Sequence, residues 1–294
     1  MLNLERLRVL RALAAAGSVR GAAGTLHVTT SAVSQQMARL EREIGQPLVE
    51  RSGRGIRLTD AALLLAEHAD TLLSHAEAIE ADLARHRGAV AGELRVAAFA
   101  TAARGLLPAA LRALRDRHPA LRVYTAEHEP AVAIPGVAGG DLDLAVVQDW
   151  PDEPLAVPPG LDRTGLTDDV FDVALPAGHR LAGRSAVELA ELAGADWVSW
   201  PAGERCHDWL RRTVPDATVV HTASEHATQL ALVAAGLGVA LVPRLGRDPA
   251  PPGVRFAAVR PAPARRVFAL WRTATARQPA IRALTVALRG VARP

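Results

Sequence analysis

Residues 61–86 contain neither glycine nor proline, and this uninterrupted run constrains the fold of the chain more than any other feature. About 26 residues at roughly 1.5 Å each predict a helix near 40 Å long. Apolar residues recur along it at alternating spacings of four and three, which is a heptad pattern. These residues are Leu65, Ala69, Leu72, Ala76, Ile79 and Leu83.

A heptad seam of this kind predicts that the helix pairs with the same helix of a second copy. Three heptads are few, so a long helix that packs on its own domain stays open as the alternative. In either case the helix separates a short head from a much longer body.

Charge is distributed unevenly around this helix. Residues 1–58 carry nine arginines against four glutamates, a net charge of +5, whereas residues 59–91 carry a net −4 and the remainder a net +2. The formal charge of +3 therefore conceals a basic head on an acidic connector. A basic head favours contact with phosphates, and a solvated arginine-bearing surface is the alternative.

The head is predicted to contain three short helices. Apolar residues at helical spacing indicate a first helix that ends at Gly17 and a second over residues 19–25. After a short turn, Thr29 or Thr30 caps a third helix that reaches about residue 44.

Hydroxyl and amide side chains are left on the outer face of the third helix, as reading of the DNA major groove requires. A short hairpin follows, and its arginines are expected either to lie along the DNA backbone or to enter a minor groove. The alternative is a three-helix domain with an ordinary hairpin that binds no nucleic acid. The predicted DNA-binding residues are Thr29, Thr30, Ser31, Ser34, Gln35 and Arg39 on the helix, with Arg51 and Arg54 in the hairpin.

This head resembles the DNA-binding domain of LysR-type transcriptional regulators. The matching residues are Ala22, Ala23, Leu26, Val28, Ser31, Ala32, Val33, Ser34, Gln36, Leu40, Glu41, Gly45, Pro47, Leu48, Val49, Arg51, Arg54, Leu58, Thr59 and Ala61. The family usually has glutamine and proline at Thr30 and Ser31, phenylalanine at Val49 and glycine at Ala62. The first pair lies at the start of the third helix, so the base preference is expected to differ from that of common members.

The body alternates predicted strands and helices, which favours a mostly parallel sheet. Strands are expected at residues 93–98, 121–126, 142–147, 170–175, 197–200, 218–222, 239–243 and 266–271, and helices at residues 101–117, 205–213, 226–235 and 279–289. The elements group into two α/β lobes joined by crossing strands, with a cleft between them where a small ligand binds. This layout resembles the effector-binding domain of the same family, which is similar to periplasmic solute-binding proteins.

The predicted fold is therefore an α+β multi-domain chain with three parts. A winged helix-turn-helix occupies residues 1–58, a linker and dimerisation helix residues 59–88, and an effector-binding domain residues 89–294. Lobe I of that domain takes about residues 92–164 and 266–294, and lobe II about residues 165–265.

Residues at the ends of the predicted strands are the candidates for contact with an effector. Thr101 and Ala102 lie where a strand ends and a helix begins, so free backbone N–H groups there favour an anion. Thr101 also matches the position at which the family usually places a ligand-binding serine or threonine. Capping or packing is the alternative role for each candidate. The other candidates are Gln148, Ser199, Trp200 and His226.

Composition excludes several enzyme classes. All 34 basic residues are arginine, so a phosphate-binding loop lysine, a Schiff-base lysine and a kinase strand lysine are absent. Cys206 is the only cysteine, and its neighbour His207 lacks metal-ligand spacing. The sequence contains no GxSxG or HExxH motif. We therefore expect no catalytic residue, no metal and no cofactor.

The function predicted from these features is sequence-specific transcriptional regulation, with operator binding modulated by a small molecule held between the lobes. The expected partners are double-stranded operator DNA, the effector, further copies in a homodimer and homotetramer, and RNA polymerase. No membrane partner is expected, and a single cysteine together with no apolar leader favours the cytoplasm. A non-switching architectural DNA-binding or solute-binding protein is the alternative.

Overall fold

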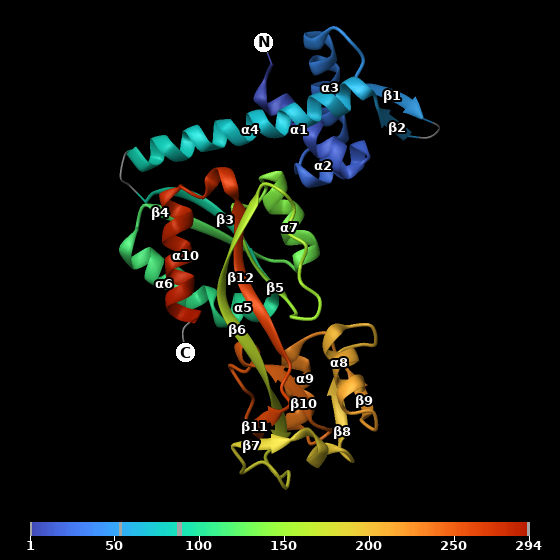
Figure 1. The fold of residues 1–294 in the computed structure, drawn as a ribbon, viewed down its shortest axis with the longest axis vertical. Helices are drawn as coiled ribbons and strands as arrows, with labels where there is room; N and C mark the ends of the chain where they lie inside the picture. The colour runs from blue at the N-terminus through green and yellow to red at the C-terminus, as the bar shows by residue number, and fades with distance from the viewer. Residues whose placement is uncertain (1, 53–54, 87–89, 293–294) are drawn as a thin grey trace.

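The computed structural model describes residues 2–52, 55–86 and 90–292. Its parts follow one another along the longest axis: the head, the long helix α4 (Asp60–His86) across the top of the body, then lobe I and lobe II (Figure 1). The C-terminal helix lies in lobe I (Figure 1). No helix among the described residues is both long and apolar enough to cross a membrane.

The head has the predicted three helices and hairpin. The helices are α1 (Leu4–Ala16), α2 (Val19–Thr25) and α3 (Thr30–Ile44), and the antiparallel strands are β1 (Val49–Ser52) and β2 (Gly55–Leu58).

Local signals explain the boundaries of these helices. Gly17 and Gly45 end α1 and α3 in the left-handed conformation, with φ of 63° and 75°. The hydroxyls of Ser18 and Thr29 accept hydrogen bonds from backbone N–H groups and so cap α2 and α3. The predicted cap of the third helix is therefore confirmed, with Thr29 rather than Thr30 in the capping position.

The first half of α4 packs into the core of the head. Ala62, Ala66, Ala69 and Leu73 are buried there, and α4 packs mainly against α1. Ala69 is fully buried, so its prediction as a dimer contact is wrong: spacing alone could not show that the head uses this face of α4.

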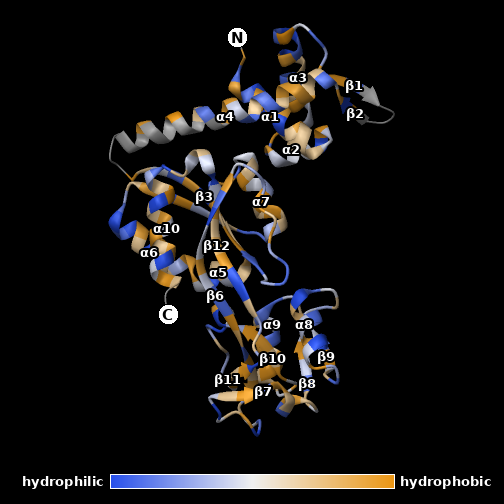
Figure 2. Ribbon diagram, viewed as in Figure 1, coloured by the Kyte–Doolittle hydropathy of each residue, from blue (hydrophilic) through white to orange (hydrophobic). Residues whose placement is uncertain are grey.

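Further along α4 the predicted seam is open. Leu72, Ile79 and Leu83 have exposed fractions of 41%, 61% and 55%, while Leu65 and Ala76 are half-buried. Figure 2 shows apolar residues at intervals along α4 among polar ones. The helix thus packs on its own head at one end and leaves apolar side chains exposed toward the other.

Lobe I contains three parallel strands, β4 (Leu121–Glu127), β3 (Gly92–Ala98) and β5 (Leu144–Asp149), in this spatial order. Its helices are α5 (Ala100–Gly105), α6 (Leu107–Arg117), α7 (Pro130–Gly139) and α10 (Pro279–Ala292).

The single helix expected over residues 101–117 is in fact two helices, and this prediction is wrong. Pro108 lies in the first turn of α6, where it supplies no N–H for a continuous helix and where its ring would clash with the carbonyl of Arg104 if α5 continued without a break. The chain therefore breaks at Leu106, between α5 and α6.

Two long strands, β6 (Leu161–Pro176) and β12 (Ala264–Arg272), connect the lobes side by side (Figure 1). β12 is antiparallel to both β5 and β6. The strand order is β4-β3-β5-β12-β6, followed by β11 (Val254–Arg260) and β7 (Ala186–Glu188), and β10 (Ala240–Pro243) also pairs with β6. The expectation of a mostly parallel sheet is therefore wrong, because no crossover helix separates β5 from β6 or precedes β12.

Lobe II surrounds the second half of β6. Its strands are β7 (Ala186–Glu188), β8 (Asp196–Ser199), β9 (Thr218–Thr222), β10 (Ala240–Pro243) and β11 (Val254–Arg260), and its helices are α8 (Arg205–Thr213) and α9 (His226–Ala234). Phe171, Trp197 and Leu241 belong to its apolar core, and Figure 2 shows these strands as largely hydrophobic. The sequence did not indicate α7, β7 or β11.

Candidate functional site

The outer face of α3 is the candidate DNA-reading surface. Its predicted residues are all exposed, namely Thr29, Thr30, Ser31, Ser34, Gln35 and Arg39. The opposite face holds Val33, Met37 and Leu40 in the core of the head. The amphipathic pattern thus fixes which side of α3 is available to DNA.

Two of these residues are engaged within the helix itself. The Thr29 hydroxyl accepts a hydrogen bond from the Ala32 N–H at 3.2 Å, and the Ser34 hydroxyl donates to the Thr30 carbonyl at 3.0 Å. Gln35 and Arg39 form no side-chain hydrogen bond with any described residue. Their amide and guanidinium groups therefore remain available for base edges and phosphates.

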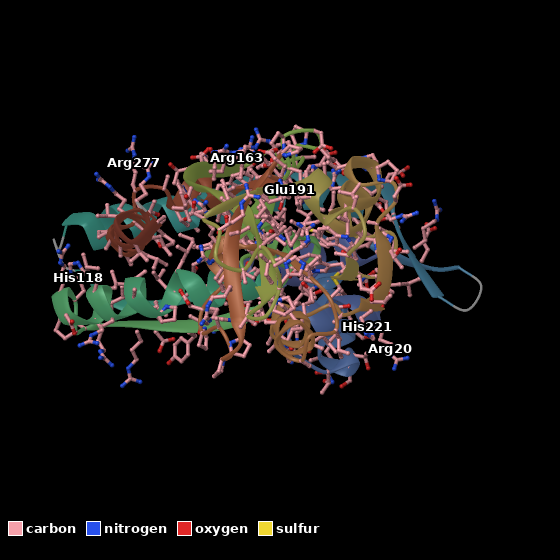
Figure 3. The ribbon with its side chains drawn as sticks, turned by 90° about the horizontal axis from the view of Figure 1, so that it is seen from below. Arg20, His118, Arg163, Glu191, His221 and Arg277 are labelled. Carbon is pink, nitrogen blue, oxygen red and sulfur yellow. The ribbon has the colours of Figure 1, made fainter. Side chains whose placement is uncertain are left out.

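Glu41 fixes the hairpin relative to α3. Its carboxylate accepts hydrogen bonds from the backbone N–H groups of Leu48 at 2.8 Å and Val49 at 3.1 Å. The hairpin projects away from the rest of the molecule (Figures 1 and 3). The predicted contacts of Arg51 and Arg54 lie outside what the structure describes, which omits the side chain of the first and all of the second.

Ion pairs divide the arginines of the head into two groups. Arg6 pairs with Glu43, Arg8 with Glu5 and Arg57 with Glu50. Arg20, Arg39 and Arg42 form no ion pair with a described residue. Arg20 projects from the edge of the molecule (Figure 3). These three unpaired cations concentrate the positive charge of the head on groups that can contact phosphates.

A second candidate site lies where β6 and β12 pass between the lobes, and its centre is Arg265. The Arg265 guanidinium donates hydrogen bonds to Asp169 from Nε at 3.0 Å and from Nη2 at 2.8 Å, and Nη2 also donates to the Thr101 hydroxyl. The side chains of Arg265 and Asp169 are only 6% and 1% exposed. This buried pair links strand β12, strand β6 and the start of α5.

Aromatic rings enclose this buried pair. The guanidinium carbon of Arg265 lies 4.8 Å from the ring centre of Phe99 and 5.4 Å from that of Phe171. The Phe171 ring is 6.3 Å from Trp200, whose ring is 4.8 Å from His226. The chain has few aromatic residues, so their gathering here is notable. We call Phe99, Thr101, Asp169, Phe171, Trp200, His226 and Arg265 the interlobe cluster.

His226 contributes a neutral imidazole to the interlobe cluster. Burial, followed by the nearby charges of Arg265 and Arg104, lowers its pKa to about 3. Its Nε2 atom is buried and has no hydrogen-bond partner among the described residues. The imidazole is therefore uncharged at neutral pH and offers an unused polar atom to a ligand.

Gln148 and Glu129 lie at the border of the cluster. Burial raises the pKa of the Glu129 carboxyl, and the Arg265 charge and a hydrogen bond from Gln148 partly oppose this increase. The Oε1 atom of Gln148 is buried without a partner within the described chain. A ligand with a hydrogen-bond donor would satisfy it.

Cys206 also lies near this pair of charges. Burial raises the pKa of its thiol to about 12, which the Arg265 charge opposes, although part of the residue surface is exposed. The sulfur is thus a protonated thiol at neutral pH, which is a poor nucleophile.

The structure brings together three of the predicted effector residues, Thr101, Trp200 and His226, with Gln148 beside them. Ala102 instead lies in the apolar core of lobe I. Ser199 is buried in β8, which pairs with β9.

Sequence reasoning missed Asp169, Phe171, Glu129 and Arg265. The sequence carried only a weak signal, because Asp169 and Arg265 each lie beside an apolar strand run but have charged neighbours, Asp168 and Arg266, and burial of a charge requires a partner. The sequence does not show that Asp169 pairs with Arg265, because 96 residues separate them.

Most side chains of the interlobe cluster are buried at the place where an open cleft was expected. Surface depressions occur on lobe II beside Glu188 and Arg260, with a volume of about 420 Å³, and in the head beside Gly17 and Arg57, with a volume of about 350 Å³. No group of three or more His, Cys, Asp or Glu residues in the described chain is arranged to hold a metal ion. The cluster offers hydrogen-bond donors, a neutral imidazole and aromatic surface, which suit binding of a small polar molecule.

A winged helix-turn-helix joined by a long helix to a two-lobed α/β body defines a DNA-binding regulator with a ligand-responsive domain. Comparison with protein families agrees: residues 4–63 match the bacterial regulatory helix-turn-helix of the lysR family, and residues 87–293 match the LysR substrate binding domain. The chain belongs to the LysR family of transcriptional regulators. It is a DNA-binding transcription regulator whose activity a small-molecule effector modulates.

The matches with named relatives cover nearly the whole chain. A probable hydrogen peroxide-inducible genes activator of Streptomyces viridosporus is 30% identical over 98% of this chain and 93% of its own length. Full-length OxyR of Pseudomonas aeruginosa has a TM-score of 0.71 at 25% identity, covering 98% of this chain and 95% of that one. A cysteine variant of Corynebacterium glutamicum OxyR with hydrogen peroxide bound has a TM-score of 0.59 at 27% identity, covering 98% and 92%.

Proposed function

We propose that this regulator reads its operator with Gln35 and Arg39 of α3. The observation that supports this is that both side chains are exposed and have no partner within the described residues, while their neighbours on α3 cap or brace the helix. Arg20 and Arg42, with Arg51 and Arg54 of the wing, contact phosphates on either side.

The protein acts as a dimer formed through α4, and two dimers assemble into a tetramer. The exposed apolar residues Leu72, Ile79 and Leu83 support the dimer, because they lie on one side of α4 and expose much of their surface. A dimer places two recognition helices for a two-fold operator. The assembly works in the cytoplasm with RNA polymerase and has no catalytic activity.

The effector binds at the interlobe cluster and parts the lobes to enter it. Three polar groups support this: the buried Nε2 of His226, the buried Oε1 of Gln148, and Nη1 of Arg265, which donates no hydrogen bond to a described residue. A ligand that satisfies these groups binds the parted state better than the closed one, and this preference shifts the population.

Hydrogen peroxide is the effector suggested by the names of two relatives, and the chemistry of Cys206 argues against it here. The chain has a single cysteine, so it can form no internal disulfide. Burial raises the pKa of that thiol to about 12, and peroxide reacts with the thiolate. We therefore propose a small polar metabolite that binds without covalent chemistry.

Replacement of the exposed amide tests the reading of DNA by α3. We expect Gln35→Ala to reduce discrimination at one base pair of each half-site by roughly tenfold or more, since an amide bidentate to adenine contributes about 1–3 kcal/mol. Selection from a randomised duplex library measures this as a flattened preference at that position.

Gln46→Ala is the matched control, because Gln46 is also exposed but follows the end of α3. It should leave the selected sequence unchanged. An unaltered preference in Gln35→Ala would remove this residue from the reading surface.

A further inference from the structure

The head touches its own body through Arg11 of α1. The Nη2 atom of Arg11 donates a hydrogen bond to the backbone carbonyl of Gly139, and Nε lies 3.8 Å from a carboxylate oxygen of Asp70 in α4. The Arg11 side chain is 17% exposed. Figure 1 shows the head close to α7, which Gly139 ends. One cation of the head is therefore used for contact with lobe I.

The segment that Arg11 reaches is a compact turn between α7 and β5. Gly140 adopts a left-handed conformation with φ of 85°, and a Cβ at Gly136 would lie 2.9 Å from the Leu142 side chain. Arg272 holds both sides of the turn, because its Nη1 donates to the carbonyls of Val137 at 2.8 Å and Leu142 at 2.6 Å. The head thus contacts a firmly held part of lobe I.

Arg272 is the last residue of β12, and Arg265 of the interlobe cluster is its second. Seven residues at about 3.3 Å each place the two roughly 23 Å apart along one strand. The neighbouring strand β5 follows the same path, from the turn to Asp149, which Arg266 binds at 2.7 and 2.8 Å. Two paired strands therefore connect the interlobe cluster with the turn that the head contacts.

The end of β12 also meets the linker helix. Residues Thr273–Thr275 form a short 3-10 helix that follows Arg272 directly and lies against α4. The Thr275 hydroxyl is buried and donates to the Arg272 carbonyl at 2.9 Å. A shift of this strand would reach both the turn and α4.

Charged groups of the head and of the turn between α7 and β5 also lie close to one another. Burial raises the pKa of the Asp141 carboxyl in this turn, and His27 and Arg11 of the head are the two largest opposing influences. His27 lies in the turn just before Thr29, the cap of the recognition helix, and has a φ of 52°. The body thus places an acid near the start of the DNA-reading element.

We propose that the contact between Arg11 and the α7–β5 turn is a latch that couples the interlobe cluster to the DNA-binding head. Strands β5 and β12 carry a change in lobe geometry to the turn, and the latch passes it to α1 and the recognition helix. The proposal rests on the proposed function in one respect, that the interlobe cluster is the effector site.

Hydrogen exchange of the full-length protein without DNA tests the latch alone. In Arg11→Ala the amides of residues 139–143 should exchange about tenfold faster, which corresponds to roughly 1.4 kcal/mol for one lost hydrogen bond. Two controls should stay within about twofold of wild type: Arg8→Ala removes an arginine that pairs within α1, and Asp70→Asn removes only the α4 partner of Arg11. Equal exchange in Arg11→Ala and wild type would overturn the latch whether or not the protein binds an operator.

A double-mutant cycle tests the coupling without a known effector. Arg266→Gln disturbs the strands at the cluster end and should change affinity for a duplex from the gene's own upstream region by at least about fivefold. In the Arg11→Ala background, Arg266→Gln should change the affinity for the duplex by less than about twofold. In the Arg8→Ala background, the change of at least about fivefold should persist. An equal effect in all three backgrounds, or no effect in any, would overturn the coupling. Failure of wild type to bind the duplex would instead contradict the proposed function, in which the head reads an operator.

Discussion

Arg265→Met is expected to lower the free energy of unfolding by about 3–5 kcal/mol. The substitution keeps most of the side-chain volume but leaves the Asp169 carboxylate buried and without its cation. A buried charge without a partner costs far more than the pair contributes when it is complete. The Thr101 hydroxyl also loses its donor.

Urea unfolding at neutral pH measures this loss. The double variant Arg265→Met with Asp169→Leu should recover most of the stability, because both charges are then removed. Arg184→Met breaks a solvent-exposed pair with Glu191 and should cost far less, because water screens such a pair. If Arg265→Met costs no more than Arg184→Met, the buried pair of Arg265 and Asp169 does not stabilise the link between β12, β6 and α5.

Leu72→Glu is expected to dissociate the dimer, raising its dissociation constant by more than about 1,000-fold. Leu72 is exposed in the isolated chain, and on the seam it would lie against the partner helix. Each dimer would carry the carboxylate twice in apolar surroundings. Folding of the head should be preserved, because Leu73 and not Leu72 packs in its core.

Sedimentation over a range of concentrations gives the dissociation constant. Leu63→Glu is the matched control: Leu63 is equally apolar and exposed on α4, and nine residues place it half a turn around the helix from Leu72. It should leave the dimer intact. Intact dimers in Leu72→Glu would show that α4 does not form the seam.

The head could be predicted closely from sequence because its signals are local. Gly17, Ser18, Thr29 and Gly45 each act within three or four residues, so caps and helix ends follow directly from residue type. The failure at Ala69 has a different origin. A heptad spacing identifies an apolar stripe but not what covers it, and here the head covers part of it.

The body could be predicted only in part because its main features depend on distant partners. Most strand and helix positions follow from the alternation of apolar runs, but the antiparallel insertion of β12 between β5 and β6 brings together segments more than 90 residues apart. The same is true of the candidate site. Thr101 was identified from its place at a helix start, whereas Arg265 acquires its role from Asp169 and two phenylalanine rings that only the fold brings to it.

A footprint on the gene's own upstream region, with and without candidate metabolites, tests most directly whether a ligand at the interlobe cluster changes operator binding. We expect wild type to protect a two-fold symmetric site and one small polar metabolite to change the protected length, while hydrogen peroxide leaves it unchanged. Thr101→Val should protect the same site with no response to that metabolite, because the variant loses the hydroxyl at the interlobe cluster. An equal metabolite response in wild type and Thr101→Val, or a change in the footprint with peroxide that Cys206→Ser abolishes, would contradict this account.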